Sequence, residues 1–107
     1  MSYTVQITET AKQDLREIAL YIAEQAADPE TAKRFISELR TECEKLRFPA
    51  QTGAFPKDRI LKSLGYRYIP FKDYLIFYTI NEENSAVNIL AVFHSKRDYF
   101  RVMRKFI

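Results

Sequence analysis

The sequence contains very few of the residues that most often build metal centres and phosphate-binding loops. Its 107 residues include one histidine, one cysteine and two glycines. A zinc site needs about four nitrogen, sulfur or carboxylate ligands at short spacings, and no such cluster is present. Two glycines do not make a glycine-rich phosphate loop, and the nucleophile-elbow motif of Ser-His-Asp hydrolases is absent. We therefore expect neither a metal ion nor a cofactor.

The sequence also lacks a long apolar run and a leader-like start. No apolar stretch approaches the roughly 20 residues that cross a bilayer. Residues 1–15 have neither the basic start nor the apolar core of a signal peptide. The single Cys43 cannot form an internal disulfide. These features predict a cytoplasmic protein that does not associate with membranes.

Length and composition favour one folded domain over residues 1–107. Hydrophobic residues make up 47% of the chain and aromatic residues 14%, enough for one modest core. The net charge of +3 is unevenly distributed. Residues 1–50 carry seven basic and nine acidic side chains, whereas residues 51–107 carry ten basic and five acidic side chains. The second half therefore predicts a polyanionic partner, either a nucleic acid or an acidic protein.

The first half of the sequence predicts a strand followed by two helices. Residues 2–7 alternate polar and apolar side chains, which is typical of a short strand. Either Thr8 or Thr10 can cap the helix that follows. Asp28 and Pro29 mark the start of a second helix, which ends before Pro49. Because few residues separate the two helices, we expect an antiparallel hairpin. Its apolar stripes comprise Ala11, Leu15, Ile18, Ile22 and Ala26 on the first helix, and Ala32, Phe35, Ile36, Leu39, Cys43 and Leu46 on the second.

The second half predicts a loop and three strands. Residues 49–58 are rich in proline and glycine, which indicates a loop. Residues 65–71, 73–80 and 86–93 read as strands, and 73–80 is apolar on both faces, as expected of a central strand. The short connections between them favour antiparallel pairing. The predicted fold is α+β: an N-terminal strand, a two-helix hairpin packed on a small antiparallel sheet, and a short C-terminal helical or basic segment.

The stretch HSKRDYFRVMRK, residues 94–105, carries most of the candidate chemistry. It holds the only histidine, five of the seventeen Lys/Arg residues and one acid. A metal-independent ribonuclease could use His94, Arg97 and Tyr99 for proton transfer and charge stabilisation. Lys96 follows His94 directly, and further basic and tyrosine side chains of the strands could face the same surface, namely Arg67, Tyr68, Lys72 and Tyr74.

Each of these residues also has a structural interpretation. His94 could end a strand and hydrogen-bond a backbone carbonyl, and clustered lysines and arginines commonly form a solvated face. Strand aromatics such as Phe77 and Tyr78 usually form core and cross-strand pairs rather than base-stacking platforms. Cys43 lies on an apolar helical stripe, which favours a buried structural thiol. The terminal apolar residues could pack on the sheet or contact a partner, and they are Val102, Met103, Phe106 and Ile107.

Several segments together resemble the RelE/ParE superfamily of type II toxin–antitoxin toxins. The stretch TETAKQDLREIALYI resembles its first helix, and AKRFISEL followed by LRFPAQTG resembles its second helix and the loop after it. The segments YRYIPFKDYLIFYTI and VNILAVFHSKRDY resemble its last strands and the His-x-x-x-Asp ending of many ParE-like members. The resemblance spans nearly the whole chain. It implies a small α+β toxin that a cognate antitoxin wraps and neutralises in a heteromeric complex.

The superfamily implies two alternative activities. RelE-like members cleave mRNA on the ribosome without a metal, whereas ParE-like members poison DNA gyrase and are not known to catalyse a reaction. RelE-like members resemble one another in an arginine of the central strand, and Leu75 occupies the matching position. Their later arginine and tyrosine positions fall on Ser95 and Arg101, with Arg97 and Tyr99 as nearby alternatives. Losing a transition-state arginine would slow cleavage by orders of magnitude.

We therefore expect a ParE-like gyrase inhibitor used in plasmid stabilisation, with the ribonuclease as the alternative and an inactive or structural partner in an antitoxin complex as a third interpretation. Only the alternative would make the protein an enzyme, with the ribosome and mRNA as its partners. Its catalytic residues would be His94, Arg97 and Tyr99. The residues predicted to bind the target or the antitoxin are Arg67, Lys72, His94, Lys96, Arg97, Asp98, Arg101 and Arg104.

Overall fold

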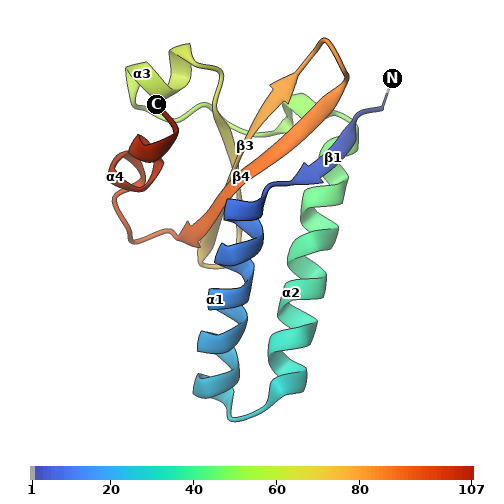
Figure 1. The fold of residues 1–107 in the computed structure, drawn as a ribbon, viewed down its shortest axis with the longest axis vertical. Coiled ribbons are helices and arrows are strands. Elements are labelled where there is room, and N and C mark those ends of the chain that lie inside the picture. Colours follow the sequence, from blue (N-terminus) through green and yellow to red (C-terminus); the bar gives the residue numbers. More distant parts are fainter. Residues whose placement is uncertain (1) are drawn as a thin grey trace.

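The computed structural model describes residues 2–107 as a sheet between a long helical hairpin and a layer of short helices (Figure 1). The elements in chain order are β1 (Thr4–Ile7), α1 (Glu9–Ala26), α2 (Pro29–Glu44), the 3-10 turns η1 (Lys45–Arg47) and η2 (Ala50–Thr52), α3 (Arg59–Ser63), β2 (Arg67–Phe71), β3 (Tyr74–Asn81), β4 (Ala86–His94), α4 (Tyr99–Met103) and the 3-10 turn η3 (Arg104–Phe106).

The hairpin begins and turns where capping chemistry places it. Thr8, rather than Thr10, caps α1, and its hydroxyl accepts a hydrogen bond from the backbone N–H three residues on at 3.2 Å. After α1, Ala27 adopts a left-handed conformation with φ 53°. Asp28 then caps α2 through its side chain, with Pro29 in the first turn. The predicted antiparallel helical hairpin is confirmed, and its far end extends beyond the sheet in Figure 1.

The sheet has the strand order β1-β4-β3-β2. The antiparallel pairing expected for the last three strands is present between β2 and β3 and between β3 and β4. β1 adds a parallel strand, in which Thr4 lies opposite Ala86 and Ile7 lies opposite Ile89. The sheet is therefore mixed, because its first strand pairs with the last strand of the chain. The long apolar segment that forms β3 lies inside the sheet, as its two apolar faces predicted.

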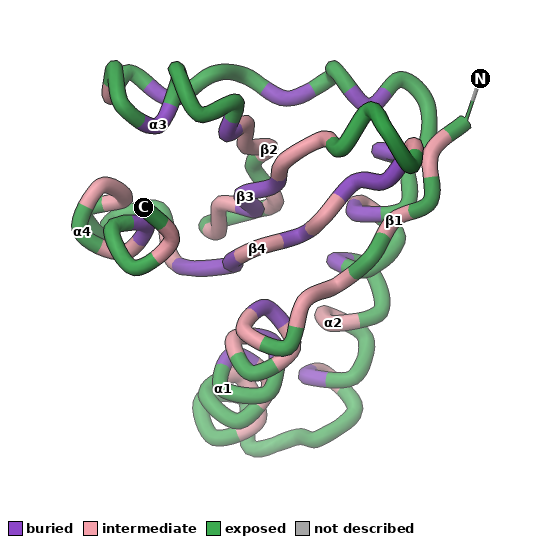
Figure 2. The backbone as a smooth tube through the Cα atoms, turned by 45° about the horizontal axis from the view of Figure 1, so that its top comes forward, coloured by how far each residue is buried: buried purple, intermediate pink, exposed green. Residues whose placement is uncertain are grey.

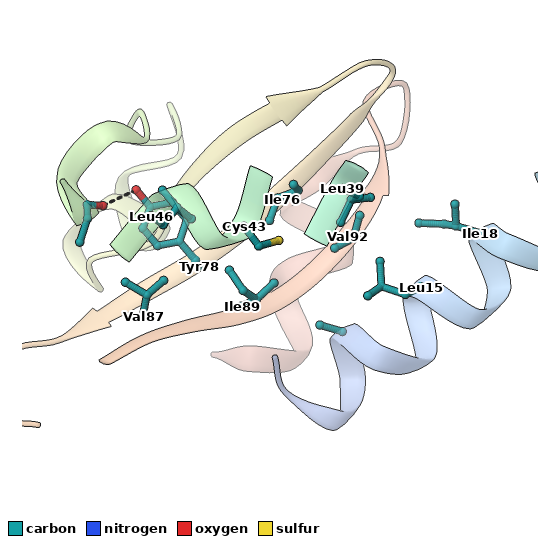
Figure 3. Close-up of a cluster of buried hydrophobic side chains, with 12 residues drawn as sticks. Leu15, Ile18, Leu39, Cys43, Leu46, Ile76, Tyr78, Val87, Ile89 and Val92 are labelled. Carbon is teal, nitrogen blue, oxygen red and sulfur yellow. Dashed lines mark hydrogen bonds between the residues drawn. The ribbon is translucent and has the colours of Figure 1, made fainter. Parts of the chain in front are cut away.

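Two clusters of buried side chains lie on opposite faces of the sheet. We call the cluster under α1 and α2 the hairpin-side core (Figure 3). Its buried members are Ala11, Leu15, Ile18, Leu39, Cys43, Leu46, Ala50, Ile76, Tyr78, Val87, Ile89 and Val92. The tube in Figure 2 shows these buried positions recurring along α1, α2 and the strands. Most of the predicted helical stripe is buried or half-buried, while Ala26 is exposed beyond the sheet.

The opposite face carries a smaller cluster, which we call the C-terminal-side core. Its buried members are Leu61, Tyr66, Phe77, Ala91, Phe93 and Met103. Met103 is fully buried and Phe106 is packed against the cluster, so the terminal apolar residues pack largely on the sheet, as one of the two readings expected. Ile107 is the exception, with 57% of its surface exposed.

The segment between the hairpin and β2 contains more helical structure than its composition predicted. A loop was expected over residues 49–58, and α3 follows it directly without having been predicted. Asp58 caps α3 by accepting a hydrogen bond from the Leu61 N–H at 2.9 Å. Earlier in the loop, the buried Tyr78 hydroxyl accepts from the Gly53 N–H at 2.8 Å and donates to the Ala50 carbonyl at 2.7 Å, the bond dashed in Figure 3.

Gly53 is required at this point by close packing. A Cβ atom there would lie 2.5 Å from the Tyr78 hydroxyl oxygen and 2.8 Å from the Tyr68 carbonyl oxygen. The loop can therefore approach the sheet only with a residue that has no side chain.

Among residues 2–107, no helix combines the length and the apolar character that crossing a membrane requires.

Candidate functional site

His94 ends β4 on the face of the sheet that α1 covers. Its ring lies edge-on to the Tyr74 ring, with centroids 5.5 Å apart. The Nδ1 atom accepts a hydrogen bond from the Lys96 N–H at 3.1 Å, and the His94 carbonyl accepts from the Arg97 N–H at 3.0 Å. In the neutral ring this leaves the proton on Nε2. The side chain thus ends the strand, as its structural interpretation expected, but the ring accepts from a backbone N–H rather than bonding a carbonyl, and it remains half-exposed.

A groove runs between α1 and the segment that follows β4. One part has a volume of about 260 Å³ and includes His94, Tyr21 and Tyr74 in its lining. A second part of about 520 Å³ reaches Arg101 and Lys105. The two parts share the lining residues Asp14, Glu17, Phe93 and Arg97. We call the whole the α1–α4 groove, and it has an acidic wall on α1 and a basic wall on the C-terminal segment.

Asp14 is the residue of this groove with the most unusual environment. Its carboxylate accepts a hydrogen bond from the backbone N–H of Val92 at 2.9 Å. Partial burial raises the pKa of Asp14 above its ordinary value, and the hydrogen bond together with the nearby Lys105 and Arg97 charges partly offsets that rise. Asp14 therefore joins α1 to β4, and its carboxylate faces the basic wall of the groove.

Asp98 and Tyr99 make structural contacts that draw them away from this groove. Asp98 caps α4 by accepting from the Phe100 N–H at 3.1 Å. The Tyr99 hydroxyl accepts from the Asp58 N–H at 3.0 Å, and the Tyr99 ring packs against Phe77 in the C-terminal-side core. The tyrosine therefore lies on the opposite face of the sheet from His94, although five positions separate them in sequence.

Arg67 and Lys72 lie at opposite ends of β2. Arg67 donates to the carbonyl of Gly53 at 2.9 Å and stacks over Phe55 at 4.1 Å, so it ties the loop to the sheet. Lys72 lies in the β2–β3 turn, at the same end of the sheet as His94, and pairs with Glu38 of α2 at 3.4 Å. Of these two predicted binding residues, Lys72 lies at the His94 end of the sheet and Arg67 lies at the opposite end.

The remaining predicted cations are exposed and lie on the C-terminal segment. Arg97 and Arg101 line the α1–α4 groove. Lys96 precedes them, and Arg104 lies over the Phe100 ring at 5.4 Å. None of these four cations forms an ion pair with another residue in the described range 2–107. Within that range, no three His, Cys, Asp or Glu side chains cluster in a way that could hold a metal ion.

The sequence model of the ParE toxin of type II toxin–antitoxin systems, parDE, matches residues 5–99. The chain belongs to the ParE toxin family. It is therefore a toxin of the RelE/ParE superfamily, as the sequence resemblance implied, and the matched range contains the hairpin, the sheet and the start of α4. No curated protein matches the sequence.

Solved structures similar to this ParE-family toxin include three toxins or toxin–antitoxin assemblies. The RelBE2 toxin–antitoxin complex of Mycobacterium tuberculosis aligns with a TM-score of 0.63 and 25% identity over 88% of this chain and 92% of that chain. The chromosomal ParDE system of P. aeruginosa aligns with a TM-score of 0.72 and 16% identity over 89% and 98%. The isolated RelE toxin of E. coli aligns with a TM-score of 0.51 and 15% identity over 99% and 100%. The last two similarities establish the fold alone.

Sequence reasoning about this ParE-family toxin missed the acidic wall of the groove. Asp14 and Glu17 border the apolar stripe that includes Leu15 and Ile18, so they had to lie near the edge of the packed helix face. That signal places two carboxylates beside the sheet. The helical pattern does not show that Arg97 faces these carboxylates, because the position of Arg97 depends on the turn after β4.

Proposed function

We propose that this toxin inhibits growth by binding and poisoning DNA gyrase, and that a cognate antitoxin neutralises it in the cytoplasm. One observation carries the choice between the two activities of the superfamily. His94 and Tyr99, which a ribonuclease would bring together, face opposite sides of the sheet, and the Tyr99 hydroxyl is occupied by the Asp58 N–H. This separation favours a binding surface over a general acid–base site.

The central strand supports the same choice. Leu75 packs against the C-terminal-side core, at the position where the resemblance to RelE-like nucleases requires an arginine. An apolar side chain there cannot stabilise the negative charge of a phosphoryl transition state. Lys96, Arg97 and Arg101 remain as exposed cations at the end of the chain's last strand. We assign target binding to them, with Lys72 and Arg104 at the margins.

The antitoxin is the second partner of this proposal. Two of the similar structures are toxin–antitoxin assemblies. An acidic antitoxin segment placed in the α1–α4 groove would pair with its basic wall and cover the residues assigned to the target. Neutralisation would then follow from direct competition for Arg97 and Arg101.

A gyrase cleavage assay tests the proposal. Purified toxin is incubated with gyrase, ATP and supercoiled plasmid, and detergent and protease are added before electrophoresis. We expect dose-dependent linear plasmid. Intact and normally processed plasmid, obtained with folded and antitoxin-free toxin, would contradict gyrase poisoning and direct attention to ribosome-dependent mRNA cleavage.

Two matched double variants test the assigned residues. Arg97→Ala with Arg101→Ala should raise the toxin concentration for half-maximal cleavage at least about tenfold, because a lost charge-assisted contact costs about 1.5–3 kcal/mol. Lys33→Ala with Lys45→Ala removes the same charge from the hairpin face and should leave the assay unchanged. Equal loss in both variants would contradict the assignment. His94→Ala should preserve most gyrase poisoning, whereas a nuclease would lose most of its activity.

A further inference from the structure

The charge of the toxin is separated along its structure. Residues 9–44, which form the hairpin, contain nine acidic and five basic side chains. The segments 57–67 and 96–105, which contain α3 and α4, have two acidic and nine basic side chains. One end of the molecule is therefore acidic overall, while the other is strongly basic.

The two ends also differ in how their charges are paired. Within residues 2–107 the four ion pairs all use a carboxylate of the hairpin: Lys12 with Glu9, Lys33 with Glu30, Lys45 with Glu42, and Lys72 with Glu38. The two carboxylates of the basic segments are occupied differently. Asp58 and Asp98 are helix caps that accept backbone N–H bonds. The cations around them form no ion pair in the described chain, although Arg97 and Lys105 lie near Asp14 across the α1–α4 groove.

The short helices bring α3 and the C-terminal segment, which carry these cations, next to each other. The Tyr99 hydroxyl of α4 meets the Asp58 N–H at the start of α3, and the Tyr66 hydroxyl donates to the Phe106 carbonyl at 2.9 Å. Figures 1 and 2 both show α3 and the C-terminal segment side by side. The exposed cations of this surface, which we call the α3–α4 cation surface, are Lys57, Arg59, Lys62, Lys96, Arg97, Arg101, Arg104 and Lys105.

The composition of this surface favours a polyphosphate over a peptide. A peptide partner needs a groove for its apolar side chains, and neither the α1–α4 groove nor the apolar groove of about 650 Å³ beside Ala19, Ala32 and Ile36 is lined by a residue of α3. A duplex carries one phosphate charge per about 1.7 Å of its axis and binds sequence-independently to clustered lysine and arginine side chains. Eight unpaired cations on two adjoining helical segments fit that requirement.

We propose that the α3–α4 cation surface binds the phosphate backbone of duplex DNA without sequence preference. The surface includes α3, which the gyrase-binding assignment does not use. Binding to DNA alone requires no gyrase, so the inference goes beyond the proposed function. The choice of DNA over RNA rests on that function, because a gyrase poison acts on an enzyme that holds DNA. The toxin thereby contacts both the enzyme and its substrate.

Fluorescence anisotropy with a labelled duplex of about 24 base pairs measures this binding directly. If about five phosphates are contacted, the affinity should fall about 500-fold between 50 and 200 mM salt. The triple variant Lys57→Gln, Arg59→Gln, Lys62→Gln should flatten the salt dependence by about three phosphate contacts and weaken binding at least about tenfold at 50 mM salt. Circular dichroism checks that the variant is folded.

The control removes the same charge from the opposite end. Lys12→Gln, Lys33→Gln, Lys45→Gln also lowers the net charge from +3 to zero, and it should bind DNA like the parent toxin. An equal loss in both triple variants would mean that binding follows net charge, and it would overturn the assigned surface. Absence of binding by the parent toxin at 50 mM salt would overturn the proposal altogether.

Two further probes test whether the surface prefers DNA to other polyanions. A duplex RNA of equal length that binds at least tenfold more tightly than the DNA, or a polyglutamate that displaces the DNA at equal charge concentration, would overturn the assignment to DNA. The gyrase assay is run in parallel with the same samples. Gyrase poisoning without DNA binding would remove only this inference, and DNA binding without poisoning would remove only the proposed function.

Discussion

The helical hairpin and the α3–α4 layer cover opposite faces of one sheet, but they differ in length, packing and charge. The hairpin buries long apolar stripes in the hairpin-side core, and its exposed lysines pair with its own carboxylates. The α3–α4 layer consists of two five-residue helices held by a smaller core, two tyrosine hydroxyls and two aspartate caps. All four ion pairs of the described residues involve hairpin carboxylates, whereas the cations of the α3–α4 layer form none. If the proposed surface binds its partners, stability depends mainly on one face of the sheet and binding mainly on the other.

The largest expected effect tests whether the two cores differ in stability. Leu39→Ala empties a fully buried site in the hairpin-side core and should lower the free energy of unfolding by about 3–5 kcal/mol. Met103→Ala empties an equally buried site in the smaller core and should cost about 2–3 kcal/mol. Urea denaturation followed by circular dichroism measures both. A larger loss for Met103→Ala would reverse the ranking of the two layers.

A pair of tyrosine variants compares the hydrogen bonds that anchor each side. Tyr78→Phe leaves the Gly53 N–H and the Ala50 carbonyl unpaired inside the protein, which should cost about 1–3 kcal/mol. Tyr99→Phe leaves the half-buried Asp58 N–H, which water can reach more easily, and should cost about 0.5–1.5 kcal/mol. Thermal and urea unfolding of the two variants test this order. Equal costs would show that the α3–α4 layer excludes water as well as the hairpin-side core does.

Helix caps give a smaller effect that separates global from local stability. Asp28→Ala removes the cap of the sixteen-residue α2 and should lower the global unfolding free energy by about 1 kcal/mol. Asp98→Ala removes the cap of the five-residue α4. The main expected result of Asp98→Ala is faster hydrogen exchange at the Phe100 and Arg101 amides, with little change in global stability. If exchange instead accelerates across the whole sheet, α4 unfolds with the hairpin as one unit.

The smallest effect concerns the pH dependence of the groove. The pKa of Asp14 is raised in the folded toxin, so its protonated form is favoured by folding. The stability contributed by Asp14 is present below the unfolded value of 3.8 and is lost as the pH rises through the folded pKa. Asp14→Asn should therefore match the parent near pH 3.5 and become relatively more stable toward pH 7. Urea titrations across this range test the sign, and a variant that loses relative stability as the pH rises would contradict it.

How far the sequence predicts this structure depends on how local each feature is. The hairpin follows from periodic apolar positions and from Asp28 and Pro29, and the three later strands follow from alternation and short turns. α3 was missed because five residues show too little periodicity to distinguish a helix from a loop. The parallel pairing of β1 with β4 was missed because no short connection joins them. The β1–β4 pairing could not be predicted from local sequence patterns, since nothing near β1 in the sequence specifies its partner.

The candidate site was predicted less completely for a related reason. The sequence placed the basic residues near one another along the chain, and the exposure of Arg97 and Arg101 agrees with their proposed role. It did not show that Tyr99 turns toward Phe77 or that Asp14 faces the groove. Both outcomes depend on the turn between β4 and α4, which is set by the hydrogen bond from Ser95 to Asp73 and by the Asp98 cap. Binding roles for these residues remain predictions.

The parallel pairing of β1 with β4 has a consequence for the time course of folding. The helical hairpin and the β2–β3 hairpin use contacts between near neighbours, which close quickly. β1 must instead pair with β4 across most of the chain, which brings Thr4 opposite Ala86. This closure carries the largest loop entropy of the sheet and should limit the folding rate. The C-terminal-side core contains no residue of β1, so the basic segment can pack on β3 and β4 before that closure, and the last part of the sheet to form is then the edge farthest along the chain from it.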